Sequence, residues 1–255
     1  MLKDNNKCKI DIVGKIPLIN TCVEASFKIS HPCKKPPKPD PVAEYKRIDI
    51  TLPLPPGVPP LPPTVFFDMD TRLDEASIRE VILRLLAEWV RHYEQKEATG
   101  TSEWAECALK YANKNLTPVW LDKERKSMIS DGKKALDFAM DTLTSFLIQN
   151  GTWAAPVGKI DYLAPTSRST IFSENANKQF HVPLDFSVNP IPLEEEAELT
   201  MAGSLFHAWM HRMGYRHPKG EYTGYLIGEA PMCLMRGYND KLPNQADSVF
   251  TQFFD

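Results

Sequence analysis

Between residues 74 and 149, apolar residues recur every three or four positions, which is the period of a helix with one buried face. Asp74 or Ser77 is placed to cap the first helix. A second helix is predicted from Ser102 to about Lys114 and a third from Asp122 to Gln149. The first helix carries the clearest stripe, made of Ile78, Val81, Ile82, Leu85, Leu86, Trp89, Val90 and Tyr93.

Short runs rich in β-branched residues lie on both sides of this helical part and predict strands. They are Lys9–Val13, Val23–Ile29, Arg47–Leu52, Lys159–Ala164, Ser169–Ser173 and Lys178–Val188. A further amphipathic helix is predicted from Glu194 to Met213, with three glutamates at the end where the helix dipole favours negative charge. These elements predict an α+β domain with a helical layer at 74–150 and a small sheet at 159–188.

Two proline clusters mark the first quarter of the chain, at residues 32–41 and 53–63. Such segments favour polyproline II and are excluded from the interior of a sheet. One interpretation is a ligand for a proline-binding partner through residues 32–63. We favour the simpler one, a stiff strap over the domain or a spacer to an upstream module. The predicted division is therefore a Pro-rich segment at 1–63 and a domain at 64–255.

Composition narrows the classes of function. The 255 residues are 42% hydrophobic and 25% charged with a net charge of −3, as in soluble globular proteins. No basic stripe with interleaved aromatic residues predicts a nucleic-acid surface, and no apolar run is long enough to span a bilayer. Residues 1–16 lack the apolar core of a signal peptide. We expect synthesis in the cytosol, which leaves room for export by a signal-independent route.

Five cysteines are present, Cys8, Cys22, Cys33, Cys107 and Cys233. An odd number cannot pair completely within one chain. Three of them crowd the first 33 residues, where one disulfide can form in an oxidising compartment. We favour free thiols or that single disulfide over a metal site.

Three closely spaced histidines predict a metal site. His207 and His211 are four residues apart on a predicted helix, so both imidazoles project from one face. Gly214 can adopt the left-handed conformation that ends a helix, and the returning chain then brings His217 to the same point. Three neutral nitrogens and one open position describe a catalytic zinc site.

This region resembles the metzincin clan of zinc metallopeptidases over about residues 194 to 240. The clan's zinc signature is similar to the pattern His207-x-x-x-His211-x-x-Gly214-x-x-His217. The resemblance implies a zincin-like fold, one zinc ion and three histidine ligands. It also implies a methionine-bearing turn beneath the zinc, for which Ala230–Met235 is the candidate, with Met232 or Met235 as the hydrophobic floor.

The residue after the first histidine departs from the pattern. A glutamate normally stands there as general base, whereas this chain has Ala208. Losing such a base typically costs about 10²–10⁴-fold in rate, while zinc binding is retained because that glutamate is not a ligand. Either a native glutamate was replaced, or the alanine is natural and the protein is a pseudoenzyme. The intact remainder of the motif favours replacement.

Other polar residues near the motif are candidates for supporting roles. In some metzincins a tyrosine two residues after the methionine binds zinc, but Tyr238 lies three after Met235. Tyr215, Tyr222 and Tyr225 are alternative phenols for an oxyanion. Glu229 is expected to be a surface charge or a residue that orients a histidine. The run Phe180–Phe186 is a candidate for a strand that pairs with substrate, and equally for a core strand.

The predicted function is a zinc-dependent metalloendopeptidase acting on a peptide or protein substrate and inactivated at Ala208. A bacterial effector or toxin suits such a protein. The alternative is a natural pseudopeptidase that serves as a zinc-stabilised binding module. A third hypothesis is a Pro-rich adaptor whose histidines are incidental.

Overall fold

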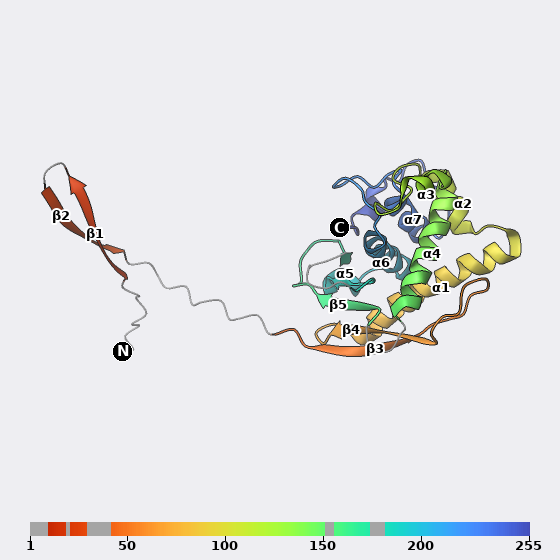
Figure 1. Cartoon of the computed structure of the whole chain (residues 1–255), viewed down its shortest axis with the longest axis horizontal. Coiled ribbons are helices and arrows are strands. Elements are labelled where there is room, and N and C mark those ends of the chain that lie inside the picture. Colours follow the sequence, from red (N-terminus) through yellow and green to blue (C-terminus); the bar gives the residue numbers. More distant parts are fainter. Residues whose placement is uncertain (1–9, 19–20, 30–41, 151–155, 174–181) are drawn as a thin grey trace. The chain divides into compact units, whose positions relative to one another are not determined.

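The computed structural model of the chain describes residues 10–18, 21–29, 42–150, 156–173 and 182–255 (Figure 1). The chain divides into two compact units, Met1–Val42 and Ala43–Asp255. The first unit contains β1 (Ile10–Leu18) and β2 (Thr21–Ile29), which pair as an antiparallel hairpin. The two strands predicted in this part of the chain are therefore confirmed within the described residues.

A mixed sheet of five strands lies in the second unit, in the order β3-β4-β5-β7-β6. Strands β4, β5 and β7 run parallel, while β3 and β6 are antiparallel to their neighbours. Figure 1 shows helices α1, α4 and α6 on one side of this sheet. The strands are β3 (Tyr45–Thr51), β4 (Thr64–Asp70), β5 (Gly158–Tyr162), β6 (Phe172–Ser173) and β7 (Phe186–Val188).

Strand β4 was missed by the sequence analysis. Its side chains alternate, with Val65, Phe67 and Met69 buried and the residues between them partly exposed. This is the period of a strand with one buried face, and it follows directly after the proline cluster. The prolines at 53–63 form the connection between β3 and β4, closed where the N–H of Leu52 donates to the Pro63 carbonyl at 3.0 Å.

The helices follow the predicted stripes, with corrected boundaries. The described helices are α1 (Glu75–Thr99), α2 (Glu103–Tyr111), α3 (Lys123–Met128), α4 (Gly132–Asn150), α5 (Pro190–Leu193), α6 (Glu198–Arg212), α7 (Leu226–Met235) and α8 (Ser248–Thr251). Asp74 caps α1 and Ser102 caps α2. In the described residues the fold is mixed α+β, as predicted, and no described helix is both long enough and apolar enough to cross a membrane.

Three predicted helices end or begin elsewhere. Helix α2 stops at Tyr111 because the N–H groups of Asn113 and Lys114 donate to the Gly224 carbonyl. The predicted helix at 122–149 is broken, because Asp131 accepts the N–H of Lys134 and begins a new helix. Helix α6 begins at Glu198, after a turn that contains the glutamates.

Helix α6 packs both against the sheet and against other helices. Its Trp209 is fully buried, stacks on Phe67 of β4 and meets Phe186 of β7 edge-on. On another side α6 packs against α7, and a Cβ at Gly203 would lie only 2.5 Å from the Met235 side chain. A glycine is required for this approach, so α6 is held between the sheet and α7.

His92, which the sequence analysis left without a role, joins three helices. Its Nδ1 lies 2.7 Å from the hydroxyl of Ser102 at the start of α2, and its Nε2 lies 3.3 Å from Asp137 of α4. The Ser102 hydroxyl accepts the N–H of Ala105 as a helix cap. His92 and Ser102 are almost completely buried, so this cluster stabilises the helical layer.

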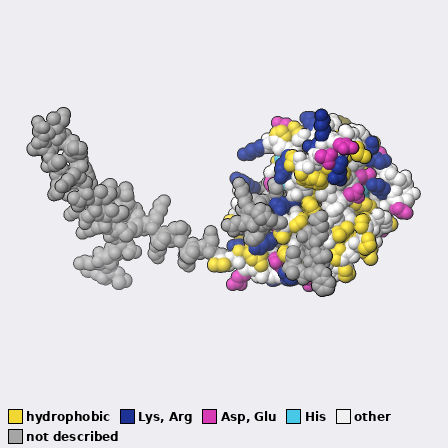
Figure 2. Space-filling model, in the orientation of Figure 1, with side chains coloured by type: hydrophobic (Ala, Val, Ile, Leu, Met, Phe, Trp, Pro, Cys, Tyr) yellow, Lys and Arg dark blue, Asp and Glu magenta, His cyan; other side chains and the backbone are white. Residues whose placement is uncertain are grey.

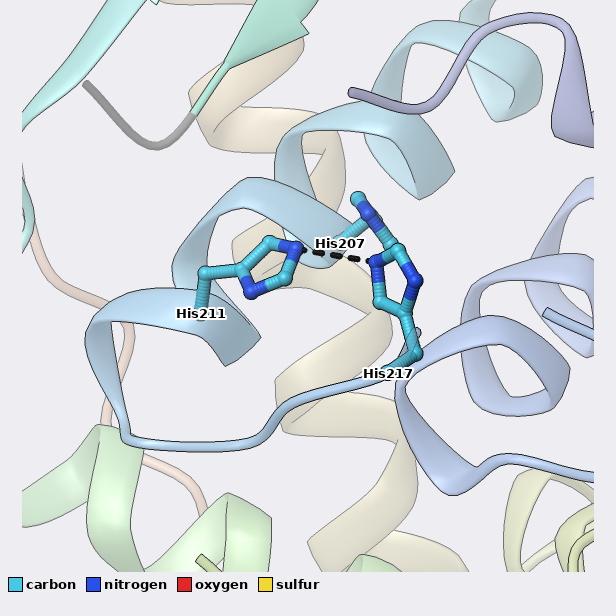
Figure 3. Close-up of side chains that lie close together, drawn as sticks. All are labelled: His207, His211 and His217. Atoms are coloured by element: carbon cyan, nitrogen blue, oxygen red, sulfur yellow. Dashed lines mark hydrogen bonds between the residues drawn. The ribbon is translucent and has the colours of Figure 1, made fainter. Parts of the chain in front are cut away.

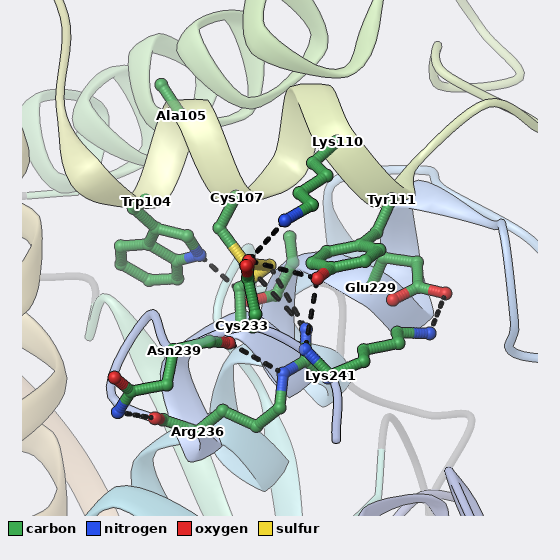
Figure 4. The surroundings of a disulfide bond; sticks show 12 residues. Trp104, Ala105, Cys107, Lys110, Tyr111, Glu229, Cys233, Arg236, Asn239 and Lys241 are labelled. Atoms are coloured by element: carbon green, nitrogen blue, oxygen red, sulfur yellow. Dashed lines mark hydrogen bonds and ion pairs between the residues drawn. A yellow bond between two sulfur atoms is a disulfide. The ribbon is translucent and has the colours of Figure 1, made fainter. Parts of the chain in front are cut away.

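A disulfide between Cys107 and Cys233 connects α2 to α7 (Figure 4). The sequence analysis did not predict this pair, whose members are 126 residues apart. The indole N–H of Trp104 adds a hydrogen bond of 2.8 Å to the Ala230 carbonyl in α7. Cys8 and Cys33 lie outside the described residues, so the disulfide expected near the N-terminus stays a prediction.

Removing the disulfide should destabilise the second unit, because it closes a long loop in the unfolded chain. We expect the double variant Cys107→Ala/Cys233→Ala to lose about 2–5 kcal/mol of unfolding free energy, measured by urea denaturation. A reductant should destabilise the wild-type chain and leave the double variant unchanged. A double variant as stable as the wild type would contradict the role assigned to this bond.

Candidate metal centre

The three predicted histidines meet at one point (Figure 3). One nitrogen from each lies within 4.8 Å of the others, and the Nε2 atoms of His211 and His217 are 3.2 Å apart. His207 and His211 project from the same face of α6, and His217 lies on the segment that follows it. The convergence predicted from the spacing is therefore confirmed.

Gly214 turns the chain as predicted. Its φ is +97°, in the region that favours glycine. Its N–H donates to the His211 carbonyl, and the N–H of Tyr215 donates to the Met210 carbonyl, both at 3.0 Å. This is the Schellman pattern that ends a helix. A Cβ at Gly214 would also lie 2.5 Å from the indole of Trp120.

The orientation of His207 is fixed by helix α7. Its Nδ1 lies 2.8 Å from the Ile227 carbonyl, which can only accept, so Nδ1 carries the proton. That carbonyl has no α-helical donor because the residue four positions later is Pro231, which lacks an N–H. In the neutral form of this imidazole the lone pair lies on Nε2. It is buried and has no hydrogen-bond partner among the described residues.

The other two imidazoles are held nearby and kept neutral. The Nδ1 of His217 donates to the Pro218 carbonyl at 2.8 Å, which leaves its Nε2 as an acceptor. Burial, followed by the neighbouring His207, lowers the pKa of His211 to about 3. Burial also lowers the pKa of His217. Neutral imidazoles offer lone pairs to a metal at neutral pH.

Two residues that the sequence analysis missed complete the surroundings. The ring of Phe254 stacks on His207, with ring centres 4.2 Å apart. One carboxylate oxygen of Asp255 lies 3.3 Å from Nε2 of His207 and 3.6 Å from Nε2 of His211. Phe254 and Asp255 lie beside the histidines through contacts between distant parts of the chain, which no local sequence pattern indicates.

Of the four candidate tyrosines, Tyr222 contacts the histidines. Its ring centre lies 4.7 Å from that of His217 and 5.8 Å from that of His207. Tyr215 is fully buried in the core. The hydroxyl of Tyr225 donates to Glu221, and that of Tyr238 donates to Glu88 on α1.

Glu229 contacts the loop before α7. It accepts the N–H of Gly224 and pairs with Lys241, each at 2.8 Å, and burial raises its pKa. It therefore stabilises the loop that carries Tyr222.

The prediction of a methionine-bearing turn at 230–235 is wrong. Residues 230–235 belong to helix α7, whose residues are all buried. The helix forms because its apolar residues cover α6 on one side and α2 on the other. Met235 still packs against α6 at Gly203, one turn before His207, whereas Met232 is buried in the core.

Ala208, which stands where the metzincin pattern has a glutamate, is also buried. Ala208 has no exposed surface and belongs to the continuous core. The helix therefore directs the histidines toward the site and places Ala208 among apolar side chains.

A pocket of about 490 Å³ is bordered by Phe254 and Asp255, which contact the histidines. Thr166, Arg168, Ser173 and Asn189 line it together with Phe254 and Asp255. Strand β6 forms the sheet edge here. The candidate substrate-pairing run at 180–186 is not that edge, because Phe186 begins β7, which is paired on both sides. Residues 180 and 181 lie outside the described residues.

Comparisons with protein-family models, curated proteins and solved structures found no match to this chain. The case for a metal centre therefore depends on the local geometry.

On the face shown in Figure 2, Lys and Arg side chains are interspersed with Asp and Glu.

Substituting Gly214 tests how the turn is built. Gly214→Ala should lower the unfolding free energy by about 1–3 kcal/mol, because it adds backbone strain and a collision with Trp120. Gly100→Ala is the matched control, since Gly100 ends α1 with φ +80° and has open space around its Cβ position. Equal losses in urea denaturation would show that the Trp120 contact contributes nothing.

Proposed function

We propose that the unit Ala43–Asp255 is a zinc-binding domain of the metallopeptidase type, silenced at position 208. The observation that carries the proposal is the convergence of His207, His211 and His217 from one helix and its returning segment. The resemblance of their spacing to the metzincin signature supports a zincin-like domain. A bound zinc ion would polarise a peptide carbonyl and lower the pKa of water.

The residues present fit a zinc ion. The buried Nε2 of His207 makes no hydrogen bond among the described residues, and it lies 3.3 Å from an oxygen of the Asp255 carboxylate. Two acceptors that face each other repel unless a cation or a proton lies between them. Carbonyl groups hold the Nδ1 protons of His207 and His217, an arrangement typical of zinc-binding histidines.

Metal analysis tests the proposal directly. The purified full chain should bind one zinc ion, detected by mass spectrometry of metals after dialysis. His211→Ala and His217→Ala should each weaken binding enough for the ion to be lost on dialysis, because each variant removes one imidazole ligand. His31→Ala is a control in the other unit and should retain the ion. A wild-type chain without zinc after incubation with the metal would contradict the proposal.

Restoring the carboxylate tests the peptidase function. We expect Ala208→Glu to cleave an unstructured protein substrate about 10²–10⁴-fold faster than the wild type, in a zinc-dependent manner. Ala208→Gln has the same size without a base and should stay inactive. Melting temperatures of both variants report whether the buried position accepts the longer side chain. A folded, zinc-loaded Ala208→Glu chain without activity would contradict the peptidase assignment.

The burial of Ala208 favours a second candidate, a zinc-stabilised binding module. In that case alanine is the residue that the core requires, and the metal holds the pocket at Arg168 and Asp255 in shape. Both long side chains at 208 would then destabilise the fold without producing cleavage. The same pair of variants therefore separates the two functions.

A further inference from the structure

The carboxylate of Asp255 lies where a further metal ligand is expected. Ligands at about 2.0–2.1 Å from a tetrahedral zinc ion are about 3.3 Å apart. The Asp255 oxygen is 3.3 Å from Nε2 of His207 and 3.6 Å from Nε2 of His211. The Nε2 atoms of His211 and His217 are separated by 3.2 Å. These three separations are close to the edge of such a tetrahedron, and the nitrogens of the three histidines all lie within 4.8 Å of one another.

Residues 253–255 are anchored by contacts with three parts of the unit. The hydroxyl of Ser204 on α6 donates to the Phe253 carbonyl at 2.7 Å. Thr170, before β6, donates to the Phe254 carbonyl at 2.9 Å, and Tyr222 donates to the main-chain oxygen of Asp255 at 3.1 Å. Phe253 and Phe254 are almost completely buried. The backbone therefore presents the Asp255 side chain to the histidines.

Charge also favours a ligand at this place. Three neutral imidazoles leave both charges of a zinc ion uncompensated, and one carboxylate reduces the net charge of the site to +1. That carboxylate has an oxygen 3.3 Å from the buried Nε2 of His207, so a cation between the two atoms would be bound by both. The carboxylate is three-quarters buried, with 25% of its side chain exposed.

We propose that Asp255 is the fourth ligand of the zinc ion, so that four side chains close the site. This inference rests on the proposed zinc binding by the histidines. Catalytic zinc sites keep one position open, whereas structural sites are closed by four protein ligands. Asp255 occupies that position from the side of the pocket. A site closed in this way favours the zinc-stabilised binding module over the peptidase.

Zinc affinity of Asp255 variants tests the inference. In competition with a chromogenic chelator, Asp255→Asn and Asp255→Ala should bind zinc about 100-fold or more weakly than the wild type, beyond the 10–100-fold effect typical of residues that only orient ligands. Asp49→Asn is the control, because Asp49 is exposed on β3. Circular dichroism and melting of the metal-free chains establish that each variant is folded.

Cobalt substitution identifies the coordination directly. The cobalt-loaded wild type should show the intense visible bands of a four-coordinate site. These bands should weaken and shift in Asp255→Asn, where water replaces the carboxylate. If folded Asp255 variants bind zinc within threefold of the wild type and keep the cobalt spectrum, Asp255 is not a ligand, while the histidine site stands. If the wild type binds no zinc, the proposed function itself fails.

Discussion

The packing of α6 against α7 is the constraint on which the metal centre depends. Gly203 allows the two helices to approach until Met235 lies against the backbone of α6. This closeness brings the Ile227 carbonyl within hydrogen-bond distance of His207. The disulfide and the indole of Trp104 connect α7 to α2 from behind. Gly203 thus controls the contact between His207 of its own helix and the Ile227 carbonyl of α7.

The same packing determines the electrostatics of the site. Burial favours uncharged imidazoles, which are the form that binds metal, but buried lone pairs without donors are costly. The core therefore holds the three imidazoles in a form that could bind a cation. Ring nitrogens that would be unfavourable in an apolar core without a partner are suited to binding an ion.

Sequence predicted what depends on neighbouring residues. Local geometry explains the apolar stripe of α1 and its Asp74 cap. It also explains the α+β class and the turn at Gly214 that brings the third histidine back to the other two. Strand β4 also has a local signal, an alternation of apolar and polar residues, but it follows directly after the proline cluster and was not predicted. The disulfide, the helical state of 230–235 and the position of Asp255 depend on tertiary contacts across the chain. No local spacing encodes them, so the sequence alone left them undetermined.

Pro231 has a consequence beyond the shape of its helix. A proline within a helix is usually regarded as a break in the hydrogen-bond ladder, and here the broken rung is the one that His207 uses. Because Pro231 has no N–H to donate to the Ile227 carbonyl, that carbonyl is free to accept the Nδ1 proton of His207. Pro231 thus acts from the opposite helix on the orientation and tautomer of His207, a candidate metal ligand.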